Sequence, residues 1–177
     1  MSTREVFNPA TGERFWFRDE TNDAAGRVRT LRYELLPGNA APFHYHPGHA
    51  QRFEVLAGQL HIRVDAKVHV LTAGQSATCA PSQAHTQWND GPEPVLAVEH
   101  YEPPLDIEPF FTHLATLGER GELKPGGAPA NPLKFATFVA DFRDVTRLAS
   151  PPLAALVRVL GLVGRCIGLR GWYKRPR

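Results

Sequence analysis

Several features are scarce in this sequence of 177 residues, and each scarcity excludes a class of protein. The two cysteines, Cys79 and Cys166, fit neither a CxxC nor a zinc-ribbon spacing and are too few for a disulfide framework. No run approaches the roughly 20 apolar residues of a membrane-spanning helix. The polar N-terminus, MSTREVFNPATGER, has no apolar signal-peptide core. We therefore expect a cytoplasmic protein.

An excess of charge of either sign is also lacking, because the formal net charge is only +2. Such a balance gives no general electrostatic reason to bind nucleic acid, and no DNA-binding motif precedes the first predicted strands. We expect no nucleic-acid partner. The basic excess is confined to the C-terminal end of the chain, where no acid follows Asp144.

Residues 1–104 have the pattern of a mainly β protein. Turn signals such as Pro37-Gly38, Ala57-Gly58 and Asn89-Asp90-Gly91 separate short runs with the alternation of strands. The predicted strands are Arg27–Leu36, Arg52–Leu56, Leu60–Val64, Lys67–Leu71, Gln75–Cys79, His85–Trp88 and Val95–Tyr101. Many short strands with no helical period between them predict an all-β barrel or jelly roll.

Residues 105–177 change to a helical pattern, which predicts a C-terminal extension of the barrel. Phe110, Phe111, Leu114 and Leu117 recur at helical spacing. A second helix is predicted from Asn131 as N-cap and Pro132 to about Phe142, and Ser150-Pro151 predicts the start of a third that ends near Gly168.

Four polar side chains form the candidate site. His44 and His46 are two residues apart, so on an extended strand both project from one face. Gln51 follows a Pro-Gly turn at the head of the next strand, where it can point back at the histidine pair. His85 begins a later strand after a proline turn. Together they predict a site for one divalent metal ion.

These residues resemble the two motifs of the cupin superfamily. The first motif has a Gly, a His-x-His pair, a Glu and a second Gly, and Gly38, His44, His46 and Gly58 fall in register with it. Gly74, Pro81, His85 and Asn89 match the second motif. The resemblance implies a double-stranded β-helix, or jelly-roll barrel, that holds Fe, Mn, Ni, Zn or Cu on three histidines and a carboxylate. It also implies a homodimer, because cupin barrels expose sheet edges that commonly pair between subunits.

Gln51 departs from the family pattern, since it stands where the motif has glutamate. An amide oxygen is neutral, so the site has one negative charge fewer and should hold a hard divalent ion less tightly. Glu54 is an alternative carboxylate, but its strand parity places it on the outer face. A site that has lost its metal is the competing interpretation.

Other side chains are placed by parity or spacing. Gln87 shares the parity of His85, and it joins Gln51 as a candidate to line the pocket, whereas Trp88 should pack outside the barrel. His49 lies in a turn and should be exposed. Tyr33 and Tyr101 could face the pocket, but parity does not place them. His61, His69, His100 and His113 have no metal-like spacing, and we expect surface or scaffold histidines there.

The third predicted helix is apolar on most of its circumference, with basic residues from Arg147 to Arg177 around it. We favour a helix that packs on the barrel or across a dimer interface. Contact with an anionic membrane surface is the alternative.

Fold alone does not settle function. The first hypothesis is a metal-dependent enzyme that acts on a small organic molecule, of oxygenase, isomerase, decarboxylase or cyclase type. The second is a binding or sensing protein that holds a small ligand at a degenerate metal site and catalyses no reaction.

Overall fold

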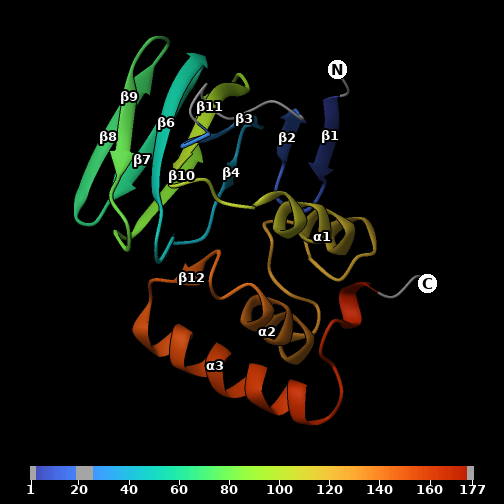
Figure 1. The fold of residues 1–177 in the computed structure, drawn as a ribbon. Helices are drawn as coiled ribbons and strands as arrows, with labels where there is room; N and C mark the ends of the chain where they lie inside the picture. Colours follow the sequence, from blue (N-terminus) through green and yellow to red (C-terminus); the bar gives the residue numbers. More distant parts are fainter. Residues whose placement is uncertain (1–2, 19–25, 175–177) are drawn as a thin grey trace.

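The computed structural model describes residues 3–18 and 26–174, and two antiparallel β-sheets form the larger part of it (Figure 1). In the first sheet the strand order is β1 (Thr3–Asn8), β2 (Glu13–Arg18), β3 (Arg29–Leu35), β11 (Val95–Glu102), β6 (Ala50–Ala57) and β9 (Ser76–Cys79). In the second it is β12 (Arg147–Leu148), β5 (His44–Tyr45), β10 (His85–Asn89), β7 (Gln59–Val64) and β8 (Lys67–Thr72), with β4 (Asn39–Ala40) paired to β10. The predicted mainly-β class is confirmed.

The strands follow the predicted alternation, because one face of each is buried. In β11, residues Val95, Ala97, Glu99 and Tyr101 are buried, while the residues between them are half-buried. Phe15, Tyr33 and Phe53 extend the same core from β2, β3 and β6. The sequence analysis did not single out β1 and β2, which lie within the segment assigned to the β region.

The β6–β7 turn requires glycine. Gly58 has a positive φ of 79°, and a Cβ atom at this position would lie 2.6 Å from the carbonyl oxygen of Pro94. The glycine therefore lets β6 turn directly into β7 close to the start of β11.

Three helices follow the barrel strands: α1 (Glu108–Glu119), α2 (Pro132–Asp141) and α3 (Pro151–Cys166), and a short 3-10 helix covers Trp172–Lys174. Helix α1 packs beside β1, and the ring of Phe111 stacks on Phe15 with centroids 3.7 Å apart. Helix α2 begins as predicted, because the side chain of Asn131 accepts a hydrogen bond from the Lys134 amide. No helix in the described ranges is long and apolar enough to cross a bilayer.

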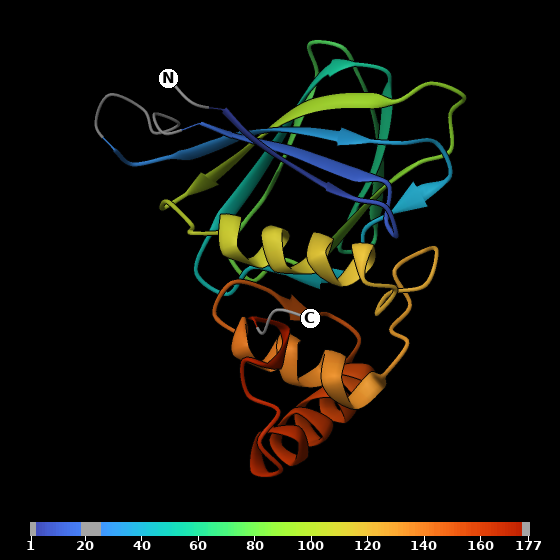
Figure 2. The ribbon, with the colours of Figure 1, turned by 90° about the vertical axis from the view of Figure 1, so that its right-hand side faces the viewer.

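Helix α3 packs on α2 and lies at the end of the molecule remote from the barrel (Figures 1 and 2). Ser150 precedes it as predicted, although its side chain makes no capping hydrogen bond, and the helix ends at Cys166 rather than near Gly168. The extension is not wholly helical. Between α2 and α3, β12 returns to the second sheet and pairs with β5, with Leu148 opposite His44.

Candidate metal centre

Three histidines that are distant in sequence converge at one end of the second sheet. His44 lies on β5 and His85 on β10, directly opposite each other in the antiparallel register, and His46 follows β5. A potential ligand atom from each of the three lies within 4.8 Å of the other two. His46 and His85 are buried, and His44 is half-buried. The structure therefore brings together the three histidines that the spacing singled out.

Backbone carbonyl groups fix the orientation of all three rings. The Nδ1 atom of His44 lies 2.7 Å from the Pro42 oxygen, that of His46 2.7 Å from the Val145 oxygen, and that of His85 2.9 Å from the Gln83 oxygen. A carbonyl oxygen only accepts hydrogen bonds, so each Nδ1 carries the proton. In a neutral imidazole this leaves the Nε2 lone pair free, which is the arrangement of metal-binding histidines.

Burial keeps these rings neutral. Desolvation lowers the pKa of His46 to about 4, despite the opposing hydrogen bond to Val145. The pKa of His85 is also lowered, mainly by burial. Near neutral pH both rings therefore present lone pairs rather than N–H groups at Nε2.

Gln51 places a fourth potential ligand atom beside the histidines. Its Oε1 atom lies 3.0 Å from Nε2 of His46 and 2.8 Å from Nε2 of His85. With both histidines in the Nδ1-protonated form, none of these three atoms has a proton to share, so three lone pairs face one another. Such an arrangement is repulsive unless a cation lies among them. The donor set therefore fits a metal ion of the kind that imidazole and amide oxygen ligands hold.

A buried carboxyl group supports Gln51 from behind. The Gln51 Nε2 donates to the Tyr101 hydroxyl at 2.8 Å, and that hydroxyl donates to Oε2 of Glu99 at 2.6 Å. All three side chains are buried. Desolvation raises the pKa of Glu99 to about 8. The Tyr101 hydroxyl thus bridges the Gln51 amide to the carboxyl group of Glu99 by two hydrogen bonds. Gln51 stands where the cupin motif has glutamate.

Glu99 was not predicted as a site residue and Tyr101 was not placed by parity, although the strand pattern contains a usable signal. Glu99 and Tyr101 share the parity of Val95 and Ala97 on a predicted strand, so a charged residue interrupts an inward-facing apolar row. Glu13 interrupts the β2 row in the same way, beside Phe15 and Phe17, and burial raises its pKa to about 7.

The remaining candidates fall into two groups. Gln87 is buried and its side chain interacts with the Tyr33 hydroxyl, although neither its Oε1 atom nor that hydroxyl makes a hydrogen bond of good geometry among the described residues. Glu54 pairs with Arg52 on the outer side of β6, and Trp88 lies half-buried beside the ring of His61. The expectation that His49 is exposed was wrong. It is half-buried, and its Nδ1 atom bonds to the carbonyl of Pro103, which holds the turn against the end of β11.

Comparisons with known proteins agree with this architecture. The sequence profile described as Cupin domain matches residues 31–101. KdgF from a Halomonas species has a similar structure, with a TM-score of 0.51 and 16% identity over 61% of this chain and 93% of that protein. No curated protein sequence matches the chain significantly.

Two further structures show weaker similarity. One is an RmlC-like cupin from Shewanella frigidimarina, with a TM-score of 0.48 and 21% identity over 59% of this chain and 87% of that protein. The other is a Klebsiella pneumoniae protein with a double-stranded β-helix domain, with a TM-score of 0.41 and 28% identity over 44% of this chain and 69% of that protein. The matching profile and the two sheets that contain the strands of this range show that the chain has a cupin domain at residues 31–101.

Proposed function

We propose that this cupin is a metal-dependent enzyme that acts on a small organic molecule and holds one divalent ion on His44, His46, His85 and Gln51. The convergence of Nε2 of His46 and His85 with Oε1 of Gln51 carries this proposal, because the three atoms are acceptors that lack a shared proton. His44 adds a third Nε2 from the facing strand.

The neutral ligand set shapes the expected chemistry. A bound divalent ion would act as a Lewis acid toward a substrate carboxylate or enolate, and a redox-active ion such as Fe, Mn or Cu would also support oxidation. Because Gln51 adds no charge, the full charge of the ion would be available to polarise what it binds. Gln51 itself is positioned by Tyr101, whose hydroxyl fixes which end of the amide faces the histidines.

Two unpaired polar atoms support a small-molecule ligand in the barrel interior. A buried polar atom without a partner costs about 1–3 kcal/mol, so such atoms call for a water molecule or a ligand. The Gln87 Oε1 and the Tyr33 hydroxyl are such atoms, because their side chains interact with each other without a hydrogen bond of good geometry. Gln87 points inward two residues after His85 on β10, so it lies on the same face as the candidate ligands. We infer that it accepts a hydrogen bond from a hydroxyl or amine of the substrate.

The first experiment is elemental analysis of protein purified without a metal-affinity tag. We expect close to one equivalent of Fe, Mn, Ni, Zn or Cu, lost in the H44A/H46A variant. The matched control is H61A/H69A, which removes two histidines outside the cluster and should keep the metal. Failure to bind any of the five ions after reconstitution would contradict the metal site.

A second experiment separates catalysis from binding alone. The loaded protein is incubated with a panel of small hydroxy and keto acids, and oxygen uptake and product formation are followed by electrode and NMR. Turnover that requires the metal and is reduced in Q87L supports the enzyme. Saturable ligand binding without turnover would indicate the binding or sensing function instead.

A further inference from the structure

The outer face of α3 is the largest feature that the proposed function leaves unexplained. Of nine large hydrophobic side chains that are exposed in the described structure, six lie on α3 and its C-cap. These are Leu153, Leu156, Val159, Leu162, Val163 and Ile167, which we call the α3 apolar face. Their exposed fractions reach 58% at Val159 and 62% at Ile167. A concentrated apolar patch of this kind marks an interaction surface rather than ordinary surface composition.

Glycines determine that this face points outward. Helix α3 buries Gly161 and Gly164 against α2, where added Cβ atoms would lie 2.8 Å from the Cβ of Ala140 and 1.9 Å from Oγ1 of Thr137. The two helices therefore approach closely through their smallest residues. The six residues of the α3 apolar face are left on the remaining circumference, so their exposure follows from how the helix is packed.

The charge of this region identifies the partner. No acidic residue occurs between residues 145 and 177, whereas Arg158 and Arg165 lie on one flank of α3 and Arg170 and Lys174 follow it. Arg165 is paired with Asp141 at 2.7 Å, but no ion pair joins Arg158 to any described residue. An apolar helical face that is flanked by Arg158, unpaired among the described residues, and followed by Arg170 and Lys174 has the chemistry of a helix that lies on an anionic lipid surface.

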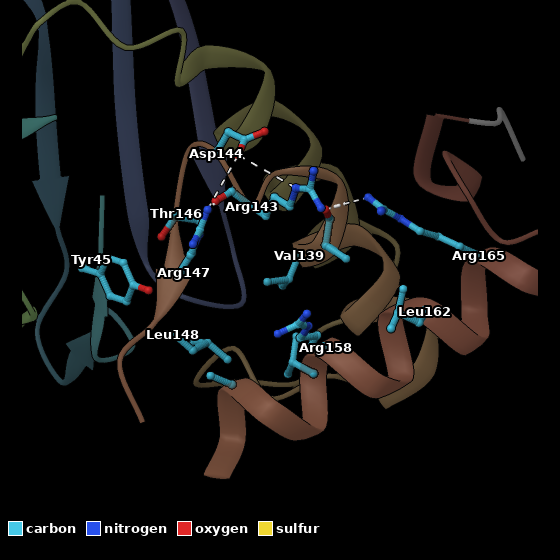
Figure 3. A pocket seen from close by; sticks show the side chains of 13 residues that line it. Tyr45, Val139, Arg143, Asp144, Thr146, Arg147, Leu148, Arg158, Leu162 and Arg165 are labelled. Carbon is cyan, nitrogen blue, oxygen red and sulfur yellow. Dashed lines mark hydrogen bonds and ion pairs between the residues drawn. The ribbon is translucent and has the colours of Figure 1, made fainter. Parts of the chain in front are cut away.

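A cleft beside α3 adds further basic residues to this region of the surface. It has a volume of about 520 Å³, lies between α2, β12 and α3, and is lined by Arg143, Arg147, Arg158 and Arg165 with Val139 and Leu162 (Figure 3). Asp144 is the acid that lines it, 3.9 Å from Arg143 and 3.8 Å from Arg147. Leu162 belongs both to this cleft and to the α3 apolar face, so the cationic and apolar surfaces are continuous.

We propose that α3 attaches the protein to the surface of a bilayer that contains anionic phospholipid, with the α3 apolar face in the boundary between headgroups and acyl chains. Helix α3 is 16 residues long and lies at the extremity of the molecule, where a flat surface can reach it (Figure 2). A second copy of the chain is disfavoured as the occupant, because Arg158 and Arg165 are the charged residues of α3, which offers no acidic residue to a copy of itself.

The test is co-sedimentation of the full-length protein with two kinds of vesicle, one of phosphatidylcholine alone and one of equal parts phosphatidylcholine and phosphatidylglycerol. We expect wild-type protein to sediment with the anionic vesicles only, and less at high salt. Binding should fall about tenfold in L156Q/V159Q and about fivefold in R158Q. The matched control is V68Q/V70Q, which removes two equally exposed apolar side chains from β8 and should bind like the wild type.

Three results would overturn the proposal. The first is wild-type protein that stays in the supernatant with anionic vesicles. The second is an equal loss of binding in V68Q/V70Q and in L156Q/V159Q. The third is a dimer, seen by analytical ultracentrifugation without lipid, that L156Q/V159Q dissociates and V68Q/V70Q does not, because a second copy would then cover the face. Circular dichroism of each variant confirms that α3 is intact in these comparisons.

Discussion

The imidazole of His46 is held by the carbonyl oxygen of Val145, which lies 99 residues later in the chain, through a contact of 2.7 Å. The C-terminal extension therefore contributes directly to the orientation of a candidate ligand. Two backbone contacts of the same segment reinforce it, since β12 pairs with β5 and the Ala149 amide donates to the Phe43 oxygen at 3.0 Å.

Loosening this contact should weaken metal binding. Val145 packs against the barrel core, so V145A removes the apolar anchor that holds its carbonyl in place. Loss of a partner that orients a ligand typically costs about 10–100-fold in metal affinity, and we expect the lower end because the carbonyl itself remains. Competition with a fluorescent chelator measures the effect. The control V157A removes the same two methyl groups from Val157, a half-buried residue of α3. A comparable loss of metal affinity in V157A would contradict the role of Val145 in orienting His46.

Restoring the family carboxylate should strengthen binding. Q51E replaces a neutral amide oxygen with an anionic one at the same distance from His46 and His85, so affinity for a divalent ion should rise about tenfold or more. Isothermal titration with Zn and Mn measures the change. Unchanged affinity in Q51E, together with unchanged affinity in Q51L, would show that residue 51 is not a ligand.

Removing the Tyr101 hydroxyl should separate Gln51 from Glu99. The Y101F variant keeps the ring but leaves the amide and the carboxyl group unpaired, and we expect about tenfold weaker metal binding and a loss of about 1–3 kcal/mol in the free energy of unfolding. Y33F is the matched control, because the Tyr33 hydroxyl is also buried but has no part in the hydrogen bonds that join Gln51, Tyr101 and Glu99. Chelator competition and urea unfolding should distinguish the two variants; equal behaviour would rule out a specific role for the chain of hydrogen bonds.

Glu13 should make stability depend on pH. Burial raises its pKa from 4.5 to about 7, so the folded protein binds a proton that the unfolded chain releases. This contribution is complete below pH 4.5 and is lost as the pH rises to about 7, at a cost of about 3 kcal/mol. In E13Q, the free energy of unfolding should no longer fall with pH over this range, as measured by urea unfolding with chelator present. The control E119Q, at an exposed position, should keep the pH dependence of the wild type. The same pH dependence in E13Q would contradict its assignment to Glu13.

The sequence predicted the cluster of His44, His46, Gln51 and His85 better than its surroundings. Strand parity and a local turn indicated His44, His46 and Gln51, and the resemblance to the second cupin motif added His85. Val145 could not be found in this way. Its role depends on a carbonyl group brought back by β12, and a two-residue strand between helices has no periodic signal.

The orientation of α3 was unpredictable for a related reason. Its sequence is apolar on nearly every side, so periodicity did not identify the face that contacts α2. Steric fit decides this, since only Gly161 and Gly164 allow the approach that the structure shows.

The pairing of β12 with β5 also has a thermodynamic consequence, because His44 and the segment that leads into α3 share one ladder. If docking of the extension strengthens cation binding at His44 and His46, the cation must, by linkage, strengthen docking of the extension by the same factor. Metal loading should therefore slow hydrogen exchange at the Ala149 amide more than at an equally exposed amide of β8. Reciprocally, if a vesicle bound to α3 rigidifies this ladder, the affinity of the site for the metal ion should rise. The fraction of protein that holds a metal ion would then differ between the free and the lipid-bound protein.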